Sequence, residues 1–543
     1  MIPNLNEEQR QAVYSQARHI LVAAPPGSGK TACLAARFGR LAAEGVRPEE
    51  LLAITFTNRA AREMKGRVAA TIGLKEQSLN IGTFHAFCLR VLKETRPGFR
   101  LYGRQDSERV LKDIGVKNPG RAADKISALK NALIPPGADA LTVLDAYRKK
   151  LFDADALDLD DLVIEAAAAL GSGAAQKRFG HVLVDEYQDI NPRQSALIKC
   201  LVKDGASLFA IGDPDQAIYG FRGADARGFL EFERDFPGCA VIRLKRNYRS
   251  AGNIVKAAGA LIRGNADRVE NETLPTRGNG VILRAEAADG RAEAGFIIKE
   301  IESAMGGLTS LTVKDAGNNR FSDFAVLFRT KRQAHALIEA FDGSAIPHHY
   351  VTLPGATIAE FIAYISSHEH PPDADISGYI EAQARLLKIP KPVFEILMQA
   401  AWPYKGARIS ESFAQYLEDL KLLDGPDTYD IEADKVSLMT IHASKGLEFK
   451  YVFIAGVEDG LIPLRMKDKD FDIEEERRLL YVGMTRAKDA LYLLSARTRT
   501  LCGVESGQST SLFLSELPTE LVPAAIIEKK KTRRRAIQKG LFE

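Results

Sequence analysis

The chain has 543 residues, of which 45% are hydrophobic and 27% are charged, proportions that are typical of soluble globular proteins with several domains. It contains no run of about 18 apolar residues, and its five scattered cysteines form no CxxC pair. These features exclude a membrane span and argue against a zinc site, an iron–sulfur cluster and a disulfide framework. The net charge is +3, but residues 528–543 carry +5 and the remainder carries −2, so contacts with nucleic acid would need local basic patches.

The N-terminal segment MIPNLNEEQRQAV is polar and acidic. It resembles neither a signal peptide nor a transit peptide, so the expected compartment is the cytoplasm.

A glycine-rich loop follows in the segment LVAAPPGSGKT, residues 21–31. The apolar stretch HILVAA before the loop predicts a buried strand, and the stretch after it predicts a helix that ends at Gly45. A strand, a glycine loop, a lysine and a helix together indicate a phosphate-binding P-loop, with a chance Gly/Lys turn as the alternative. Pro25 and Pro26 lie before the amides that must donate, so they stiffen the loop without removing its cradle. The residues expected to hold phosphates and Mg²⁺ are Gly27, Ser28, Gly29, Lys30 and Thr31.

An acidic strand end lies further along in HVLVDEYQD. Residues 181–184 predict an apolar strand, and Asp185 and Glu186 come directly after it. Downstream of a P-loop, Asp185 suits the role of holding Mg²⁺ through water, and Glu186 suits that of polarising the attacking water. A plain acidic turn is the alternative. The two motifs together predict nucleotide hydrolysis.

Seven further blocks stand in order along the chain: LNEEQRQAV (5–13), AITFTNRAAREMKGRV (53–68), GTFHAFCLRVL (82–92), IGDPDQAIYGFRGAD (211–225), LKRNYRS (244–250), LMTIHASKGLEF (438–449) and EEERRLLYVGMTRAK (474–488). This ordered set resembles the UvrD/Rep/PcrA group of superfamily 1 DNA helicases, from Leu5 to about Pro518. The resemblance implies a DNA-dependent ATPase that moves 3′ to 5′ on single-stranded DNA and acts at junctions of single and double strands.

The resemblance assigns roles in ATP binding residue by residue. Gln9 would read the adenine edge, Tyr248 would stack on the base, and Glu448 would bind the ribose beside Gly446. Gln216 would sense the γ-phosphate, while Arg249 and Arg486 would act as arginine fingers, since phosphoryl transfer needs positive charge on the equatorial oxygens. A solvated helix arginine is the alternative for Arg486. The implied catalytic set is Lys30, Asp185, Glu186, Gln216, Arg249 and Arg486, with Thr31 and Asp185 at the metal. The chain departs from its closest relatives at Ala32, where they usually carry an arginine near the adenine, so selectivity for ATP is less firmly implied.

Aromatic side chains in the same blocks suit the binding of single-stranded DNA, because bases stack on aromatic faces. By resemblance, the DNA track consists of Phe56, Asn58, Thr83, Phe84, His85, Tyr219, Phe221 and Arg222 in the first lobe and Thr440 and His442 in the second. Tyr219 follows Gln216 closely, so one short segment would touch both ATP and DNA. A core position in a strand is the alternative for Phe56.

Strands and helices alternate through four parts of the chain, which is typical of α/β domains with parallel sheets. By resemblance these parts form two RecA-like P-loop lobes with nucleotide in the cleft between them, and closure of the cleft couples hydrolysis to movement. The predicted boundaries are 1–90 and 179–246 for the first lobe, 91–178 for a mainly helical insertion in it, 247–352 and 434–519 for the second lobe, 353–433 for a reduced insertion in that lobe, and 520–543 for a basic flexible tail.

The reduced insertion is shorter than the domain that relatives commonly carry there, and it contains no Gly-Ile-Gly loop of the kind that touches duplex DNA. This departure argues against unaided duplex unwinding. The alternative is that the missing part normally inhibits unwinding, so that its loss would relieve that inhibition. Trp402 is expected in the core of this insertion. The histidines at 348–349 and at 368 and 370 are interpreted as loop residues, with a metal site as the alternative.

The basic tail ends in QKGLF, residues 538–542. This sequence resembles the Gln-x-x-Leu-Phe peptide by which bacterial proteins dock on the replication sliding clamp, with Gln538, Leu541 and Phe542 as anchors. A solvated arm that contacts phosphates is the alternative.

The leading hypothesis is therefore an ATP- and Mg²⁺-dependent DNA helicase of repair, recombination or replication. A related hypothesis is a translocase that removes bound proteins from single-stranded DNA and unwinds little duplex. The alternative from another class is an ATPase-switched subunit of a nuclease or sliding-clamp complex, in repair or phage defence.

Overall fold

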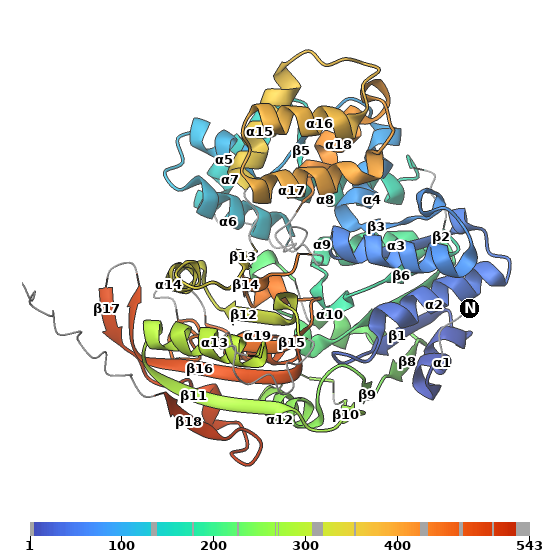
Figure 1. The fold of residues 1–543 in the computed structure, drawn as a ribbon. Helices are drawn as coiled ribbons and strands as arrows, with labels where there is room; N and C mark the ends of the chain where they lie inside the picture. Colours follow the sequence, from blue (N-terminus) through green and yellow to red (C-terminus); the bar gives the residue numbers. More distant parts are fainter. Residues whose placement is uncertain are drawn as a thin grey trace, which may run out of the picture. The chain divides into compact units, whose positions relative to one another are not determined.

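The computed structural model describes residues 5–131, 138–175, 179–224, 227–266, 268–269, 271–306, 319–351, 355–423, 433–465, 471–501 and 504–527 (Figure 1). The chain divides into two compact units whose segments alternate along the sequence. The first unit comprises Met1–Arg249, Asn265–Thr276 and Val351–Asp430, and the second comprises Ser250–Gly264, Arg277–Tyr350 and Ile431–Glu543.

The first unit is built on a six-stranded parallel sheet with the strand order β3-β2-β6-β7-β1-β8. Because every strand runs in the same direction, all the carboxyl ends lie along one edge, which is where open α/β sheets bind ligands. The strands are β1 (His19–Ala23), β2 (Leu51–Thr55), β3 (Ile81–Thr83), β6 (His181–Val184), β7 (Ser207–Gly212) and β8 (Ala240–Arg243).

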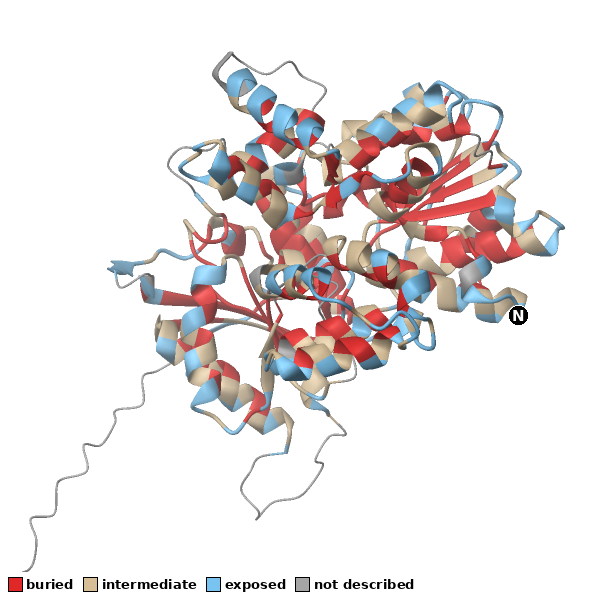
Figure 2. Ribbon diagram, turned by 90° about the horizontal axis from the view of Figure 1, so that it is seen from above, coloured by how far each residue is buried: buried red, intermediate tan, exposed pale blue. Residues whose placement is uncertain are grey.

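Helices cover both faces of this sheet, and alternate residues of one strand enter different cores. In β1, Ile20 and Val22 pack in one core, whereas Leu21 and Ala23 pack in the other. The first core includes residues of α1 (Glu7–Tyr14), α2 (Lys30–Ala43) and α3 (Asn58–Ile72), and the second includes residues of α4 (Phe84–Thr95), α8 (Leu159–Gly171), α9 (Pro192–Val202), α10 (Arg227–Leu230) and α11 (Phe232–Asp235). Figure 2 shows the buried residues concentrated in the strands and on the inner sides of the helices.

A small helical subdomain is inserted between β3 and β6 of this sheet. It contains α5 (Arg104–Asp113), α6 (Pro119–Asn131) and α7 (Ala138–Asp153), with the two-stranded sheet of β4 (Arg100–Tyr102) and β5 (Ala156–Asp158). The ammonium group of Lys130 is buried there and lies 2.6 Å from Asp158 and 2.8 Å from Asp161. This ion pair joins α6 to the start of α8, because Asp158 caps that helix.

A second helical segment, residues 355–423, belongs to the first unit although it interrupts the sequence of the second. Its helices α15 (Gly355–Ser367), α16 (Ile376–Leu386), α17 (Lys391–Ala401) and α18 (Ile409–Lys421) share one core and lie beside one another (Figure 1, yellow to orange). Lys421 donates to the carbonyl of Leu101 at 2.8 Å, and Lys93 forms an ion pair with Glu418, so α18 packs on the first unit. The expectation that Trp402 lies in the core of this segment is wrong, because 69% of the residue is exposed.

The second unit contains another mainly parallel sheet, with the order β13-β14-β12-β15-β16-β11-β18 and β17 antiparallel beside β16. Its strands are β11 (Val281–Asp289), β12 (Phe324–Phe328), β13 (His348–Tyr350), β14 (Val436–Thr440), β15 (Phe449–Ile454), β16 (Ala487–Leu501), β17 (Val504–Gly507) and β18 (Ala524–Ile527), and its helices are α12 (Gly252–Ile262), α13 (Gly290–Ala304), α14 (Lys331–Asp342), α19 (Ile473–Met484) and α20 (Leu512–Ser515). A short ladder of β9 (Arg246–Asn247) and β10 (Leu274–Pro275) belongs to the first unit.

The α/β class and the two parallel-sheet lobes with helical insertions are confirmed. Among the residues that the structure describes, no helix is long and apolar enough to cross a membrane.

Candidate nucleotide site and nucleic-acid interface

The P-loop lies at the carboxyl end of β1, and two glycines give it the conformation that it needs. Gly27 and Gly29 have φ values of +69° and +84°, a region that favours glycine. A Cβ atom on Gly27 would lie 2.6 Å from the Cβ atom of Arg249, and one on Gly29 would lie 2.8 Å from Nε2 of Gln9. The loop therefore has no room for a side chain at Gly27, and a side chain at Gly29 would have to displace Gln9 and adopt a left-handed backbone.

The loop leads directly into α2, whose first N–H groups have no partners within the helix. Gly29 caps this helix without a side chain that would compete for those groups. They are oriented to bind an anion, which the positive end of the helix dipole also favours. Lys30 Nζ donates to the carbonyl of Ala24 at 3.1 Å, so its ammonium group lies over the loop. The carbonyl of Pro25 accepts from Ser28 Oγ at 2.7 Å, so this proline takes part in the loop as an acceptor.

The residues predicted to bind the base lie beside this loop and are joined by Asn6. Gln9 Nε2 donates to the carbonyl of Ser28 at 2.8 Å, and Gln9 Oε1 accepts from the backbone N–H of Asn6 at 3.0 Å. Asn6 Nδ2 donates to the hydroxyl of Tyr248 at 2.8 Å. Asn6 thus fixes both side chains, a role that sequence analysis missed. The signal for it was the capping pattern Asn-x-x-Gln at the start of α1.

Arg249 is held against the loop by its neighbour Asn247. Asn247 Nδ2 donates to the carbonyl of Pro26 at 2.8 Å, and its Oδ1 accepts from the backbone N–H of Arg249 at 3.0 Å. The backbone N–H of Tyr248 donates to the carbonyl of Gly27 at 2.9 Å. Residues 247–249 therefore lie within reach of the P-loop backbone, in the same unit.

Asp185 and Glu186 follow β6 on the same edge of the sheet. Burial, together with the neighbouring Glu186, raises the pKa of Asp185 to about 7, although Lys30 opposes this shift. Glu186 has φ of +51° and ψ of +44°, a left-handed conformation that is uncommon for a non-glycine residue. The side chain of Thr31 is at the start of α2, so both residues predicted for Mg²⁺ belong to the first unit.

Gln188 connects this acidic pair to the residue predicted to sense the γ-phosphate. Its Nε2 donates to Glu186 Oε2 at 2.6 Å, and its Oε1 accepts from the backbone N–H of Asp213 at 2.9 Å. Asp213 Oδ2 in turn accepts from Gln216 Nε2 at 2.6 Å. Burial raises the pKa of Asp213 to about 6, while Lys30 lowers it. The chain of contacts runs from Glu186 to Gln216, and sequence analysis did not predict the part of Gln188 or Asp213 in it.

The aromatic residues predicted for the DNA track lie close to this network. Phe56, directly after β2, stacks on Tyr219 with ring centroids 4.9 Å apart and an interplanar angle of 18°. Tyr219 is only 5% exposed, whereas Phe221, whose ring lies 6.0 Å from that of Tyr219, is 59% exposed. Phe56 is half-buried at the sheet edge and not inside the strand. The side chain of Arg222 lies outside the described part of the chain.

The block after β3 supplies the remaining track residues of the first unit. Thr83 caps α4 by accepting from the N–H of Ala86, and His85 is half-buried. Phe84 is only 2% exposed and packs in the core of the first unit. Asn58 Nδ2 donates to the carbonyl of Leu422 at 3.1 Å, and this bond connects the start of α3 to the end of α18.

The second unit gathers its own predicted residues around the loop between β14 and β15. Arg486 is buried, and its guanidinium group donates to the carbonyls of Val482 at 2.9 Å and Leu447 at 3.2 Å. Glu448 forms an ion pair with Lys488 at 2.7 Å. The remaining residues of this group are Thr440, whose hydroxyl accepts from the N–H of Ala443, His442, which opens a short helical turn, and Gly446, with φ of +81°.

Two helicase family models match most of the chain. The model described as UvrD/REP helicase N-terminal domain matches residues 5–237, and the model described as UvrD-like helicase C-terminal domain matches residues 242–355 and 384–498. The chain belongs to the UvrD/REP helicase family. It is therefore an ATP-hydrolysing helicase by class.

Curated relatives of the family cover nearly the whole chain. The ATP-dependent DNA helicase UvrD1 of Mycobacterium bovis is 32% identical, and the alignment spans 96% of this chain and 86% of the relative. The ATP-dependent DNA helicase PcrA of Staphylococcus epidermidis is 30% identical, spanning 98% of this chain and 89% of the relative, and PcrA of Staphylococcus aureus is also 30% identical, spanning 98% and 88%.

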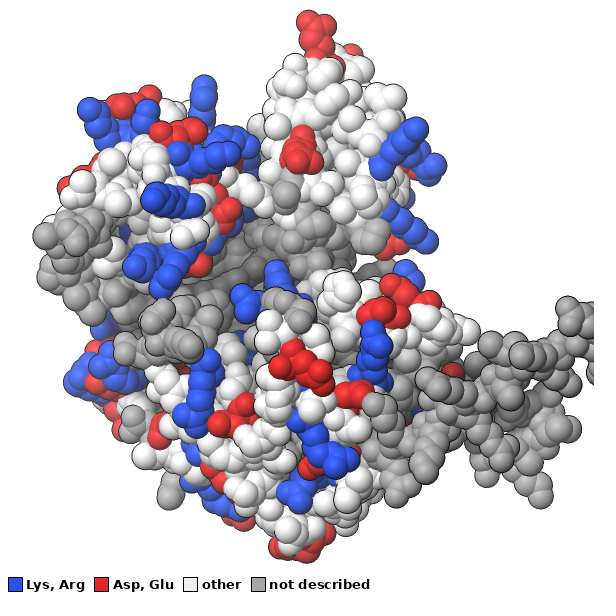
Figure 3. All heavy atoms as spheres, turned by 90° about the vertical axis from the view of Figure 1, so that its left-hand side faces the viewer, with Lys and Arg blue, Asp and Glu red and all other residues white. Residues whose placement is uncertain are grey.

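One face of this helicase carries mixed charge. On the face shown in Figure 3, Lys and Arg side chains alternate with Asp and Glu side chains and form no single continuous basic surface. Within the described residues, no three His, Cys, Asp or Glu side chains are placed to hold a metal. Gln538, Leu541 and Phe542, predicted to dock on a sliding clamp, lie outside the described residues.

Proposed function

We propose that this helicase is an ATP-driven 3′-to-5′ translocase that moves along single-stranded DNA in the cytoplasm and separates strands at junctions during repair, recombination or replication. The observation that carries the proposal is the contact chain from Glu186 through Gln188 and Asp213 to Gln216. Gln216 is three residues from Tyr219, which stacks on Phe56. A change at the nucleotide is thereby connected to aromatic side chains that suit the bases of a strand.

In this proposal the P-loop binds the phosphates through its amides and through Lys30. Glu186 orients the attacking water and accepts its proton, and Gln188 holds the carboxylate of Glu186 in position. Arg249 and Arg486 neutralise charge that develops on the transferred phosphoryl group. Arg486 would exchange its hydrogen bonds to the carbonyls of Val482 and Leu447 for bonds to phosphate oxygens. Until then, the bond to Leu447 holds its guanidinium group beside the segment that contains Glu448.

The residues of the first unit fit a magnesium ion that arrives with ATP. Asp185 is buried, and its pKa is raised although the positive charge of Lys30 opposes this shift. A second positive charge would therefore stabilise its ionised carboxylate. Hydroxyl and carboxylate oxygens are the ligands that Mg²⁺ prefers. Thr31 and Asp185 would hold the ion, which supplies positive charge beside the phosphates when bound.

The test is steady-state ATP hydrolysis with and without single-stranded DNA, for the wild type and for Lys30→Ala. We expect marked stimulation by DNA in the wild type and almost complete loss in the variant, because the lysine contacts the outer phosphates. Higher salt should reduce the stimulation, since phosphate contacts release counterions. Hydrolysis that is indifferent to DNA would refute the motor and favour an ATPase-switched subunit of a nuclease or clamp complex.

The short segment 355–423 favours a second candidate, a translocase that removes proteins from single strands and unwinds little duplex. The segment packs on the first unit through Leu422 and Lys421. A strand-displacement assay beside a protein-displacement assay separates the two candidates. Efficient unwinding by the purified chain alone would exclude the second.

A further inference from the structure

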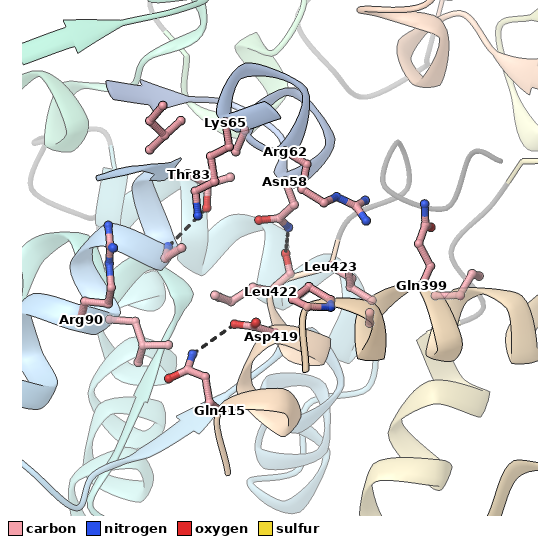
Figure 4. Close-up of a pocket in the computed structure, with 18 residues that line it drawn as sticks. Asn58, Arg62, Lys65, Thr83, Arg90, Gln399, Gln415, Asp419, Leu422 and Leu423 are labelled. Carbon is pink, nitrogen blue, oxygen red and sulfur yellow. Dashed lines mark hydrogen bonds between the residues drawn. The ribbon is translucent and has the colours of Figure 1, made fainter. Parts of the chain in front are cut away.

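A pocket of about 280 Å³ lies in the first unit where segment 355–423 meets α3, β3 and α4. Figure 4 shows Asn58, Arg62 and Lys65 of α3 together with Thr83 and Arg90 on one side, and Gln399, Gln415, Asp419 and Leu422 on the other. Both walls belong to the same compact unit.

Three cations line this pocket: Arg62, Lys65 and Arg90. All three are half-buried, and within the described residues none of them makes a hydrogen bond or an ion pair. Burial, and then the nearby charge of Arg90, lowers the pKa of Lys65, and burial lowers the pKa of Arg90. The carboxylates of Glu76 and Asp419 oppose the shift of Lys65, and those of Glu94 and Asp419 oppose that of Arg90, but burial outweighs them. Burying these cations costs free energy, and an anion between them would offset part of that cost.

One carboxylate is present among the lining residues, and its hydrogen bonds are used elsewhere. Asp419 accepts from the hydroxyl of Tyr404 and from Gln415 Nε2 at 3.2 Å. Burial raises the pKa of Asp419, while its hydrogen bonds from Tyr404 and Gln415 and the nearby Lys65 and Lys93 oppose this shift. Three cations against one carboxylate leave the lining with a net positive charge, and the lining residues include no aromatic side chain on which a base could stack.

We propose that this pocket binds a phosphate group of the single DNA strand, and that α17 and α18 form one wall of the strand-binding surface. The inference rests on the proposed function, since Asn58 and Thr83, which line the pocket, are predicted track residues. Phe56 lies two residues before Asn58, so a strand whose base reaches Phe56 has its backbone near the pocket. Segment 355–423 then contributes to binding of the DNA strand, although it is shorter than the family's usual insertion.

The test measures binding of fluorescein-labelled oligothymidylate by anisotropy over a range of NaCl concentrations. Replacing both Lys65 and Arg90 by Gln should weaken binding at least about tenfold. It should also reduce the slope of log K against log salt by about 0.7 for each DNA phosphate that the variant no longer neutralises. The control is Lys75→Gln, which removes one positive charge, half of what the double variant loses, from an exposed position outside the pocket and should change neither quantity.

A second pair of variants does not depend on buried residues. Gln399 is exposed at the pocket, and within the described residues it makes no hydrogen bond. Gln399→Lys should strengthen binding, and Gln399→Glu should weaken it, with melting temperatures unchanged.

Unchanged affinity and slope in the Lys65/Arg90 variant, with normal binding by the wild type, would overturn the pocket inference alone. A wild type that does not bind the oligonucleotide would overturn the proposed function as well. If inorganic phosphate raises the melting temperature of the wild type but not of the double variant, and oligonucleotide binding is the same in both, the pocket holds free phosphate and the inference is wrong.

Discussion

The substitution Gln188→Met removes the link between the acidic pair and the γ-phosphate sensor while nearly conserving side-chain volume. Gln188 is completely buried and makes three hydrogen bonds, to Glu186, to Asp189 at 3.1 Å and from the backbone N–H of Asp213. The buried N–H of Asp213 would be left without its partner, at a cost of about 1–3 kcal/mol, and removal of the bonds to the carboxylates adds a similar amount. We expect a destabilisation of about 3 kcal/mol, which on the scale for domains of 150–250 residues lowers the melting temperature by roughly 6–12 °C.

The effect on turnover should be larger than the effect on stability. Without Gln188 the carboxylate of Glu186 is no longer fixed, and a displacement of about 1 Å in a catalytic group costs about 100-fold in rate. The KM for ATP should change little, because Lys30 and the loop remain. DNA-stimulated ATP hydrolysis and thermal denaturation would be measured beside Gln11→Met, an exposed glutamine of α1. A variant with wild-type kcat and a normal melting temperature would refute the role of this contact chain.

Three further predictions concern charge, packing and stacking. Burial raises the pKa of Asp185 to about 7, so its contribution to stability is fully present below about pH 4 and is lost as the pH rises to 7. Asp185→Asn should therefore raise the melting temperature of the nucleotide-free protein more at pH 8 than at pH 5 while abolishing hydrolysis, and equal shifts in scanning fluorimetry would contradict this account. Lys130→Met leaves two carboxylates without their cation and should cost about 3–5 kcal/mol, whereas Lys125→Met, exposed on the same helix, should be nearly neutral in denaturant unfolding. Phe56→Ala should weaken oligonucleotide binding by about 1–3 kcal/mol with an unchanged salt slope, and a change confined to the slope would show that Phe56 does not stack on a base.

The nucleotide motifs were predictable because each is local in sequence. The strand before the P-loop, the helix after it and the strand before Asp185 depend on apolar runs and glycines within a few residues. Their shared location followed from the parallel direction of the strands, which puts all carboxyl ends on one edge.

The contacts between these motifs were not predictable from patterns. Gln188 lies in a stretch that reads as a turn, and only the tertiary structure brings its amide to Asp213. The stacking of Phe56 on Tyr219 joins segments that are far apart in the sequence. The exposure of Trp402 reversed the usual expectation for a large aromatic side chain, because the core of its segment is filled by the other apolar side chains of the four helices.

The packing partner of segment 355–423 also escaped sequence analysis. An amphipathic helix pattern shows which side of a helix is buried but not against what. Here single side-chain contacts, such as those of Lys421 and Glu418, attach the segment to the first unit.

The alternation of the two units along the chain has a consequence for dissecting the protein. Each unit consists of three separate segments, so the polypeptide passes from one to the other five times. No truncation at either end yields a complete unit. A single proteolytic cut at one of the five crossings leaves the other four covalent connections between the units intact. Separate production of either half would require rejoining segments in a new order, and cleavage products should remain associated until several connections are broken.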